Sequence, residues 1–212
     1  MPEKKILTDK IEKIDPGRIG SYGGFKALKK ALGMSPEDVI AEIKASGLRG
    51  RGGAGFPCGA KWEMAQKAKG DKILICNADE GEVGTFKDRH LLTHNPFLLL
   101  EGMAIAAYAI EARKAYIYLR AEYRYLLEGL LNALQQAEEK GYLKDLDITI
   151  QEGAGAYICG EESALMNSIE GKRGESRLRP PFPTQAGLFK KPTIINNVET
   201  LSNIPIIIEK GS

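Results

Sequence analysis

Cysteine is scarce in this 212-residue sequence: Cys58, Cys76 and Cys159 are the only three, and they lie far apart. A disulfide framework needs an even set of cysteines, and zinc or iron–sulfur sites use closely spaced pairs such as Cys-x-x-Cys, a motif that does not occur. We therefore expect three free thiols in a reducing compartment, the cytoplasm, and no metal site built on cysteine.

The sequence also lacks an excess of charge of either sign, because 30 basic and 28 acidic residues leave a formal net charge of +2. It has neither a polybasic arm nor an acidic tail, so we expect no partner selected by bulk charge and no nucleic acid. The apolar share of 43% and the charged share of 27% are those of a globular chain rather than a disordered one.

Long apolar runs are missing too. The longest, residues 97–110, is interrupted by Glu101 and Gly102 and falls short of the ~20 apolar residues that a membrane-spanning helix needs. The N-terminal sequence MPEKKILTDK has no apolar region typical of a signal peptide. We expect neither membrane insertion nor secretion.

Histidine occurs only twice, as His90 and His94, four positions apart. Two imidazoles at that spacing on a helix are able to share a metal ion, but the glutamate of the zinc-protease motif and a third ligand are lacking. We interpret the two histidines as a solvated surface pair, with a metal site as the alternative, and we expect no metal.

Helical and strand patterns alternate along the chain. Ser35, Pro36, Asp38 and Gly47 carry the start and stop signals of a helix. Further helices are predicted over residues 61–69, 95–112, 122–140 and 161–170, and strands over 73–77, 115–119 and 147–150. Residues 172–191 are predicted to form a long ordered loop, and no element is assigned to 193–208.

Strand–helix–strand–helix–strand order predicts a three-layer α/β domain with a mostly parallel sheet. We place this domain over residues 35–212 and treat residues 1–34 as an N-terminal extension and lead-in.

The first glycine-rich segment, residues 50–55, matches the pattern G-x-G-x-x-G. The dinucleotide fingerprint requires a strand directly before it and a helix directly after it, whereas here a helix precedes and Phe56-Pro57 intervenes. Glycines nevertheless let a phosphate or a flat ring approach the backbone, and Arg51 and Lys61 add positive charge nearby. The alternatives are a flexible linker, which Phe56 argues against, and an RGG-type nucleic-acid segment, which would repeat.

The second glycine-rich segment, residues 153–160, follows a predicted strand and leads into a predicted helix. That is the anion-binding arrangement at a helix N-terminus, although the first turn holds Glu161 and Glu162. Two interpretations stay open. The acids complement the helix dipole, or a carboxylate accepts ribose hydroxyls and repels an additional phosphate.

Polar side chains gather where the strand over residues 73–77 ends: Asn77, Asp79, Glu80 and Glu82. Ligands of open α/β sheets bind beyond the carboxyl ends of strands. An ordinary turn is the alternative, because Asn, Asp and Gly dominate turns. A further polar cluster consists of Asn196, Asn197 and Thr200.

Five motifs together resemble a known family. GLRGRGGAGFPCGAKW, CNADEGEVGTFKDR, EGAGAYICGEESALMNSIEGKRG, RLRPPFPTQAGLFKKPT and NNVETLSNIP are similar, in this order, to the NADH-binding flavoprotein subunit of respiratory complex I. The same module occurs in NAD-reducing and electron-bifurcating hydrogenases and NAD-linked formate dehydrogenases. The resemblance extends over residues 22–208. It implies a Rossmann-like α/β domain whose glycine-rich loops hold FMN without a covalent bond, while NADH stacks on the flavin and delivers hydride.

The resemblance also implies which residues bind each molecule. For FMN these are Gly50, Arg51, Gly52, Gly53, Lys61, Asn77, Asp79, Glu80, Tyr157, Gly160, Glu161, Glu162, Asn196, Asn197 and Thr200. For NADH they are Gly52, Gly53, Ala54, Phe56, Lys61, Glu82, Glu162, Arg179 and Phe182, with the two phenylalanines flanking the adenine. No side chain is assigned as a general acid or base.

Some positions depart from the family pattern. Met64 stands where many relatives have an aromatic that stacks on adenine, Cys58 replaces a common Thr, and Val83 replaces a common Pro. Family members also continue into a β-rich segment and a helical domain that ligates a [4Fe–4S] cluster, which we do not expect in this chain.

The resemblance implies oxidation of NADH as the electron-input module of a larger complex. The implied partners are a thioredoxin-like [2Fe–2S] subunit and a hydrogenase, a formate dehydrogenase or the complex I arm, which would bring the chain to the inner face of the membrane. The alternative is a catalytically incomplete module that binds flavin or nucleotide.

Overall fold

The central sheet has four strands, β1 (Lys72–Ala78), β2 (Ala112–Leu119), β3 (Asp147–Glu152) and β4 (Thr193–Asn197). The computed structural model describes residues 6–8 and 11–212. Its strands are ordered β3-β2-β1-β4, and every neighbouring pair is parallel. The predicted α/β class with a parallel sheet is confirmed.

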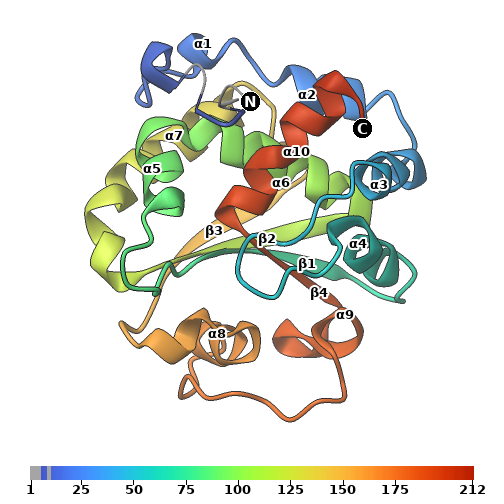
Figure 1. Cartoon of the computed structure of the whole chain (residues 1–212), viewed down its shortest axis with the longest axis vertical. Coiled ribbons are helices and arrows are strands. Elements are labelled where there is room, and N and C mark those ends of the chain that lie inside the picture. The colour runs from blue at the N-terminus through green and yellow to red at the C-terminus, as the bar shows by residue number, and fades with distance from the viewer. Residues whose placement is uncertain (1–5, 9–10) are drawn as a thin grey trace, which may run out of the picture.

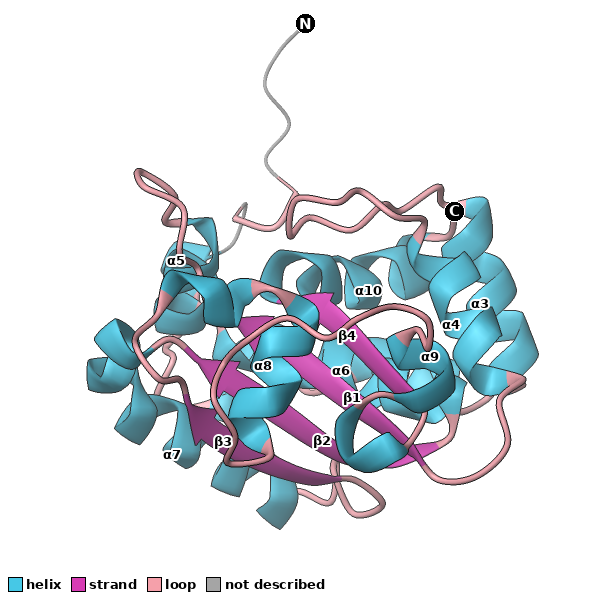
Figure 2. Cartoon of the chain, turned by 90° about the horizontal axis from the view of Figure 1, so that it is seen from below, coloured by secondary structure: helices cyan, strands magenta, loops and turns pink. Residues whose placement is uncertain are grey.

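Helices cover both faces of this sheet (Figure 1). One face carries α6 (Pro96–Ile110), α7 (Leu127–Glu139) and α10 (Val198–Lys210). The opposite face carries α8 (Glu162–Ile169) and α9 (Pro183–Ala186), which lie in front of the strands in Figure 2. The remaining helices are α1 (Ile19–Tyr22), α2 (Lys26–Ala31), α3 (Pro36–Ala45), α4 (Cys58–Gln66) and α5 (Lys87–His94).

Both faces of the central strand β1 are buried, so residues 73–76 are continuously apolar rather than alternating. In β1, Leu74 and Cys76 belong to the large core on the α6 side. Ile73 and Ile75 point the other way, into a smaller core with Leu165 of α8. The sheet is therefore the middle of three layers, as predicted.

Local capping signals predicted several helices correctly. The Ser35 side chain accepts a hydrogen bond from the Asp38 N–H at 3.1 Å and begins α3. The Asn95 side chain accepts one from the Leu98 N–H at 3.2 Å and begins α6. Strands β1, β2 and β3 and helix α8 lie where they were predicted, with shifted ends.

Other elements differ from the prediction. Residues 172–191 are not one loop, because α9 and the 3-10 helix Leu188–Lys190 lie within them. Helix α4 begins at Cys58 rather than at residue 61, and the helix predicted from residue 122 starts as the 3-10 helix Ala121–Leu126. Helices α1, α2, α5 and α10 and strand β4 were not predicted. All but α10 are short, and β4 runs directly into α10, whose first turn is capped by the Asn197 side chain.

Residues of the N-terminal segment join the main core, where Phe25, Ala27 and Leu28 are buried. Glu101, buried in α6, accepts hydrogen bonds from the Tyr22 hydroxyl and, at 2.9 Å, from the Leu28 N–H. Burial raises the pKa of Glu101 although both hydrogen bonds oppose the shift. The domain boundary after residue 34 stays a prediction.

Candidate functional site

The sheet has a topological switch point between β1 and β4. From β1 the chain proceeds to β2 on one side, whereas β4 pairs with the other side of β1. At the carboxyl ends of this pair, Asn77 of β1 lies in register with Asn197 of β4. Open α/β sheets bind their ligands in the crevice beyond such a point.

A cavity of about 600 Å³ lies at this switch point. Its size is within the roughly 300–1,000 Å³ of typical small-molecule and cofactor sites. Segments far apart in the sequence line it: the first glycine-rich segment, the ends of β1 and β4, the start of α8, and residues 179–185.

Most of the residues predicted to bind FMN or NADH line this cavity. These are Gly50, Gly52, Ala54, Phe56, Lys61, Asn77, Gly160, Glu161, Glu162, Arg179, Phe182, Asn196, Asn197 and Thr200. Arg51, Gly53, Asp79, Glu80, Glu82 and Tyr157 are not among the lining residues. The geometry shows where these residues lie. Which of them bind FMN and which bind NADH stays a prediction.

The first glycine-rich segment is held against the junction of β4 and α10. The Arg51 N–H donates to the Thr200 hydroxyl at 2.9 Å, and the Gly50 N–H donates to the Phe56 carbonyl at 2.9 Å. A Cβ on Gly52 would lie 3.1 Å from Cβ of Asn197, so a glycine permits this close approach. The segment thus presents bare backbone to the cavity.

Charged side chains of opposite sign alternate along the cavity wall. Lys61 Nζ lies 3.3 Å from Oε2 of Glu162 and donates to the Ile195 carbonyl at 2.9 Å. Arg179 bridges Glu162 at 2.8 Å and Glu161 at 2.7 Å. The wall therefore offers carboxylate acceptors for hydroxyl groups and cations for anionic groups.

Glu161 is the N-cap of α8. Its carboxylate accepts hydrogen bonds from the N–H groups of Ser163 at 2.9 Å and Ala164 at 3.0 Å. Burial alone would raise the pKa of Glu161, but these hydrogen bonds and Arg179 outweigh it and hold the pKa below its usual value. Glu161 thus complements the helix dipole from the N-cap position, and its outer oxygen faces Arg179. The binding of a ribose by these acids stays a prediction.

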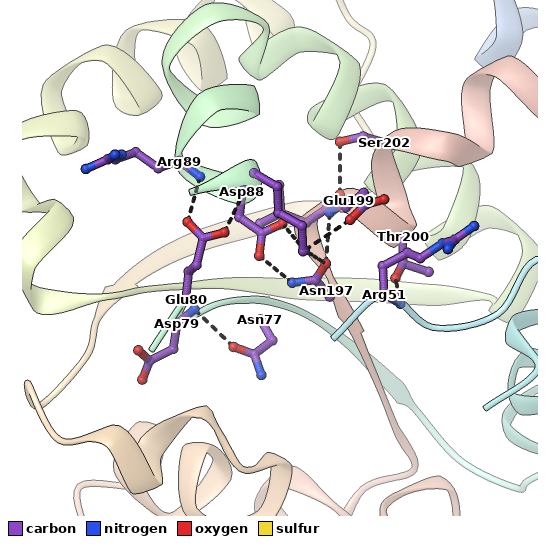
Figure 3. Close-up of polar contacts among 12 residues, drawn as sticks. Arg51, Asn77, Asp79, Glu80, Asp88, Arg89, Asn197, Glu199, Thr200 and Ser202 are labelled. Carbon is purple, nitrogen blue, oxygen red and sulfur yellow. Dashed lines mark hydrogen bonds and ion pairs between the residues drawn. The ribbon is translucent and has the colours of Figure 1, made fainter. Parts of the chain in front are cut away.

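Asn197, which lines the cavity, belongs to a polar cluster with the buried Asp88 (Figure 3). The Asn197 amide donates to Asp88 Oδ2 at 2.6 Å, and its oxygen accepts from Lys87 Nζ at 2.9 Å. Burial raises the pKa of Asp88, against the opposing effect of Lys87. No sequence pattern singled out Lys87 and Asp88, although both stand in one of the motifs that carry the resemblance.

Glu80 is part of the same cluster and does not line the cavity. Its buried carboxylate accepts hydrogen bonds from the N–H groups of Asp88 at 2.8 Å and Arg89 at 3.1 Å, and from the Tyr123 hydroxyl at 2.9 Å. It therefore holds the start of α5 in place (Figure 3).

Asn77 joins the end of β1 to the start of α8. Its amide donates to the Gly160 carbonyl at 2.9 Å, and its oxygen accepts from the Asp79 N–H at 3.0 Å. Burial raises the pKa of Asp79 to about 6, although Arg120 opposes the shift. Outside the cavity, the hydroxyl of Tyr157 donates to Glu82.

Buried side chains pack against residues that line the cavity. Trp62 Nε1 donates to Asn196 Oδ1 at 2.9 Å, and both residues are buried. Burial raises the pKa of Cys58 to about 12, so this thiol is not a nucleophile at neutral pH. Sequence analysis missed the lining residues Gly55, Pro183, Thr184, Gln185 and Ile195, most of which belong to α9 or β4.

Comparison with known proteins agrees with this geometry. Residues 43–206 match the family described as the Nuo51 FMN-binding domain. The chain belongs to that family. The family description names FMN, and the resemblance seen in the five motifs is thereby confirmed.

Relatives and solved structures place the family in larger assemblies. An NADH-quinone oxidoreductase subunit of Aquifex aeolicus is 54% identical over 197 residues, which are 89% of this chain and 46% of that protein. The HndC subunit of the NADP-reducing hydrogenase of Solidesulfovibrio fructosivorans is 48% identical over 220 residues, 98% of this chain and 45% of that protein. A chain of an NAD+-reducing [NiFe]-hydrogenase superposes with a TM-score of 0.88 at 42% identity, covering 99% of this chain and 35% of that chain.

This chain spans about half the length of the curated relatives it matches. The family's FMN fits the cavity on two observations of the structure. The bare backbone at Gly52 leaves room for a flat ring, and carboxylate, amide and ammonium groups converge on the same space.

The structure offers no grouping of three or more metal-ligating side chains within residues 6–8 and 11–212. His90 and His94 lie together on α5, with ring centroids 4.4 Å apart. Among the same described residues, none of the helices has the length and apolar character required to span a membrane.

Proposed function

We propose that this chain binds FMN in the cavity at the carboxyl ends of β1 and β4 and oxidises NADH, as the electron-input module of a multisubunit complex. The observation that carries the proposal is the cavity itself, which unites four separate sequence clusters at the switch point of a chain belonging to an FMN-binding family. The implied partners are iron–sulfur subunits, among them a thioredoxin-like [2Fe–2S] subunit.

The chain's own residues bind the flavin and NADH and orient them relative to each other. The backbone of residues 50–53 and the amides of Asn77, Asn196 and Asn197 would hold the flavin, and Lys61 would meet an anionic group. When bound, FMN accepts hydride from NADH and passes electrons on singly. The reaction requires that two planar rings lie face to face, so positioning rather than proton transfer is the protein's task.

Phe56 and Phe182 would receive the adenine of NADH. Both line the cavity and are half exposed, at 48% and 51%, so an adenine ring has apolar surface to cover at the mouth. Met64, 48% exposed, lines the same mouth and would offer a flexible apolar contact in place of an aromatic one.

Glu162 would select NADH over NADPH, because its carboxylate would meet a 2′-phosphate with like charge. We expect Glu162→Gln to raise the ratio of kcat/KM for NADPH to that for NADH about tenfold, which corresponds to ~1.4 kcal/mol. Steady-state rates with both nucleotides measure the ratio, and Glu175→Gln, at an exposed site outside the cavity, is the control. An unchanged ratio would remove this role from Glu162.

Ferricyanide reduction by the FMN-reconstituted chain tests the proposed activity. NADH-dependent turnover is the expected result, because ferricyanide takes electrons without a physiological partner. The second candidate is a flavin-binding module that does not turn over. Bound flavin without NADH-dependent activity would support that candidate.

A further inference from the structure

A second cavity, of about 500 Å³, lies at the opposite edge of the sheet from the candidate site. It reaches Ala112, the first residue of β2, and Leu146, just before β3, so it opens at the amino ends of the strands. One wall is formed by residues 23–32, which include α2, and the other by residues 140–146 between α7 and β3. We call it the lysine-flanked groove.

The floor of the lysine-flanked groove is apolar. It consists of Leu28 and Leu32 from the α2 segment and Ala104, Ala107 and Tyr108 from α6. Leu32 is 55% exposed, so it extends this apolar surface to solvent. Leu28, Ala104 and Ala107 are buried, so Leu32 and the half-buried Tyr108 are the apolar floor residues most open to a partner.

The two walls are fixed to each other. The rings of Phe25 and Tyr142 stack at a centroid distance of 4.5 Å and an interplanar angle of 9°. The Tyr108 hydroxyl donates to the Met34 carbonyl at 2.6 Å and anchors the floor. The groove is therefore formed without a partner. Binding of a segment there requires little rearrangement of the protein, which lowers the free-energy cost of binding.

Positive charge lines both walls. Lys26 and Lys29 stand on the α2 wall and Lys140 and Lys144 on the other, all exposed, with Asp145 as the one acidic residue among the described lining residues. None of the four lysines forms an ion pair with another residue of the described ranges. Four uncompensated cations thus flank an apolar strip.

We infer that the lysine-flanked groove docks an acidic amphipathic segment of a partner subunit. Apolar side chains of that segment lie on the floor, and its carboxylates on both flanks pair with the four lysines. An anionic lipid carries its charge at one end of an apolar chain, whereas these lysines stand on both walls. The names of the relatives as subunits agree with a protein partner.

A synthetic amphipathic peptide with a leucine face and glutamates on both flanks serves as the probe, and the same peptide with lysines in place of glutamates is its control. Fluorescence anisotropy measures binding, and amide hydrogen exchange maps the protected residues. We expect the acidic peptide alone to bind, with protection confined to residues 23–32 and 140–146 and affinity that falls with added salt.

Charge reversal then tests the lysines. Lys26→Glu with Lys144→Glu should weaken binding of the acidic peptide about tenfold or more, ~1.4 kcal/mol. The matched control, Lys69→Glu with Lys190→Glu, makes the same change in net charge at exposed lysines outside the groove and should bind as the wild type does. If both variants weakened binding equally, net charge rather than the position of the lysines would explain the effect.

Absence of binding, protection elsewhere, or equal affinity for the basic peptide would overturn the inference. Binding to phosphatidylglycerol vesicles in place of the peptide, with the same response to the variants, would do so too and would assign the groove to a membrane surface. Flavin binding by the charge-reversal variants is expected to stay unchanged, because the groove and the candidate site share no lining residue. If the groove does not bind the acidic peptide, the proposed binding of FMN and oxidation of NADH are unaffected.

Discussion

At the scale of single residues, Asn197 connects the candidate cavity to the ion pair of Lys87 with the buried Asp88. It contacts Lys87 and Asp88, which lie 110 and 109 positions earlier in the sequence. Separation of that size explains why sequence analysis found Asn197 and missed its supports. Asn197 stands in a polar cluster at a strand end, whereas Lys87 and Asp88 acquire their role only when α5 packs beside β4.

Asp88 is therefore predicted to support flavin binding without touching the flavin. Asp88→Asn removes the charge that holds Lys87 and Asn197 together, so we expect the Kd for FMN to rise about tenfold, ~1.4 kcal/mol. Quenching of flavin fluorescence measures the Kd. The control Asp71→Asn changes an exposed acid that pairs with Lys191 away from the cavity. Equal Kd values for Asp88→Asn and wild type would contradict the supporting role.

Asp79 is predicted to make folding depend on pH. Burial raises its pKa from 3.8 to about 6 in the folded protein, which therefore binds a proton there more tightly than the unfolded chain does. The contribution of Asp79 to the free energy of unfolding therefore decreases as the pH rises from 3.8 to about 6.

We expect Asp79→Asn to be more stable than wild type near neutral pH by on the order of 1 kcal/mol, after allowance for solvent screening. The difference should disappear at about pH 4, where the wild-type carboxyl is protonated. Urea unfolding at both pH values measures it. A stability difference that does not change with pH would show that the Asp79 carboxyl titrates normally.

At the scale of secondary-structure elements, α6 and α10 cross at unusually short range. A Cβ on Gly102 of α6 would lie 2.1 Å from the Leu201 carbonyl oxygen of α10. Pro205 stands in the interior of α10 and has no N–H to offer that carbonyl, four residues before it. A glycine thus packs directly on a carbonyl that a proline has left free.

Gly102→Ala is accordingly predicted to destabilise the fold by about 1–3 kcal/mol, the usual effect of overpacking a core. The matched variant is Gly129→Ala in α7, where a Cβ would meet nothing within 4 Å. Because alanine favours helix over glycine, that variant should gain about 0.5–1 kcal/mol. Thermal unfolding compares the two. Loss of stability in both, or in neither, would refute the packing argument.

Several predicted elements carry local signals. Helices α3 and α6 have capping residues, and β1 is an apolar run bounded by polar residues. Strand β4 has no such signal, and the start signals of α9, Pro183 and Gln185, lie in a proline- and glycine-rich stretch that is typical of a loop. Contacts with β1, α4 and each other hold β4 and α9 in place. The residues they contribute to the cavity, such as Ile195 and Gln185, were missed for that reason.

At the scale of the whole molecule, the order β3-β2-β1-β4 creates the candidate site. Alternation of helices and strands predicted a parallel sheet but not this order, because β4 is the strand that places the switch point beside β1. Once β4 is in place, the glycine-rich segment, the β1 end and the start of α8 meet at one cavity although more than a hundred residues separate the first from the last.

The absorption spectrum of the FMN-loaded chain, recorded before and after anaerobic addition of NADH, shows whether the cavity holds a flavin that NADH reduces. We predict that the chain retains FMN through gel filtration and that NADH bleaches the flavin band within the mixing time. Retained flavin that NADH leaves oxidised would contradict the proposed oxidation of NADH. A chain that folds but retains no FMN would contradict the assignment of the cavity itself.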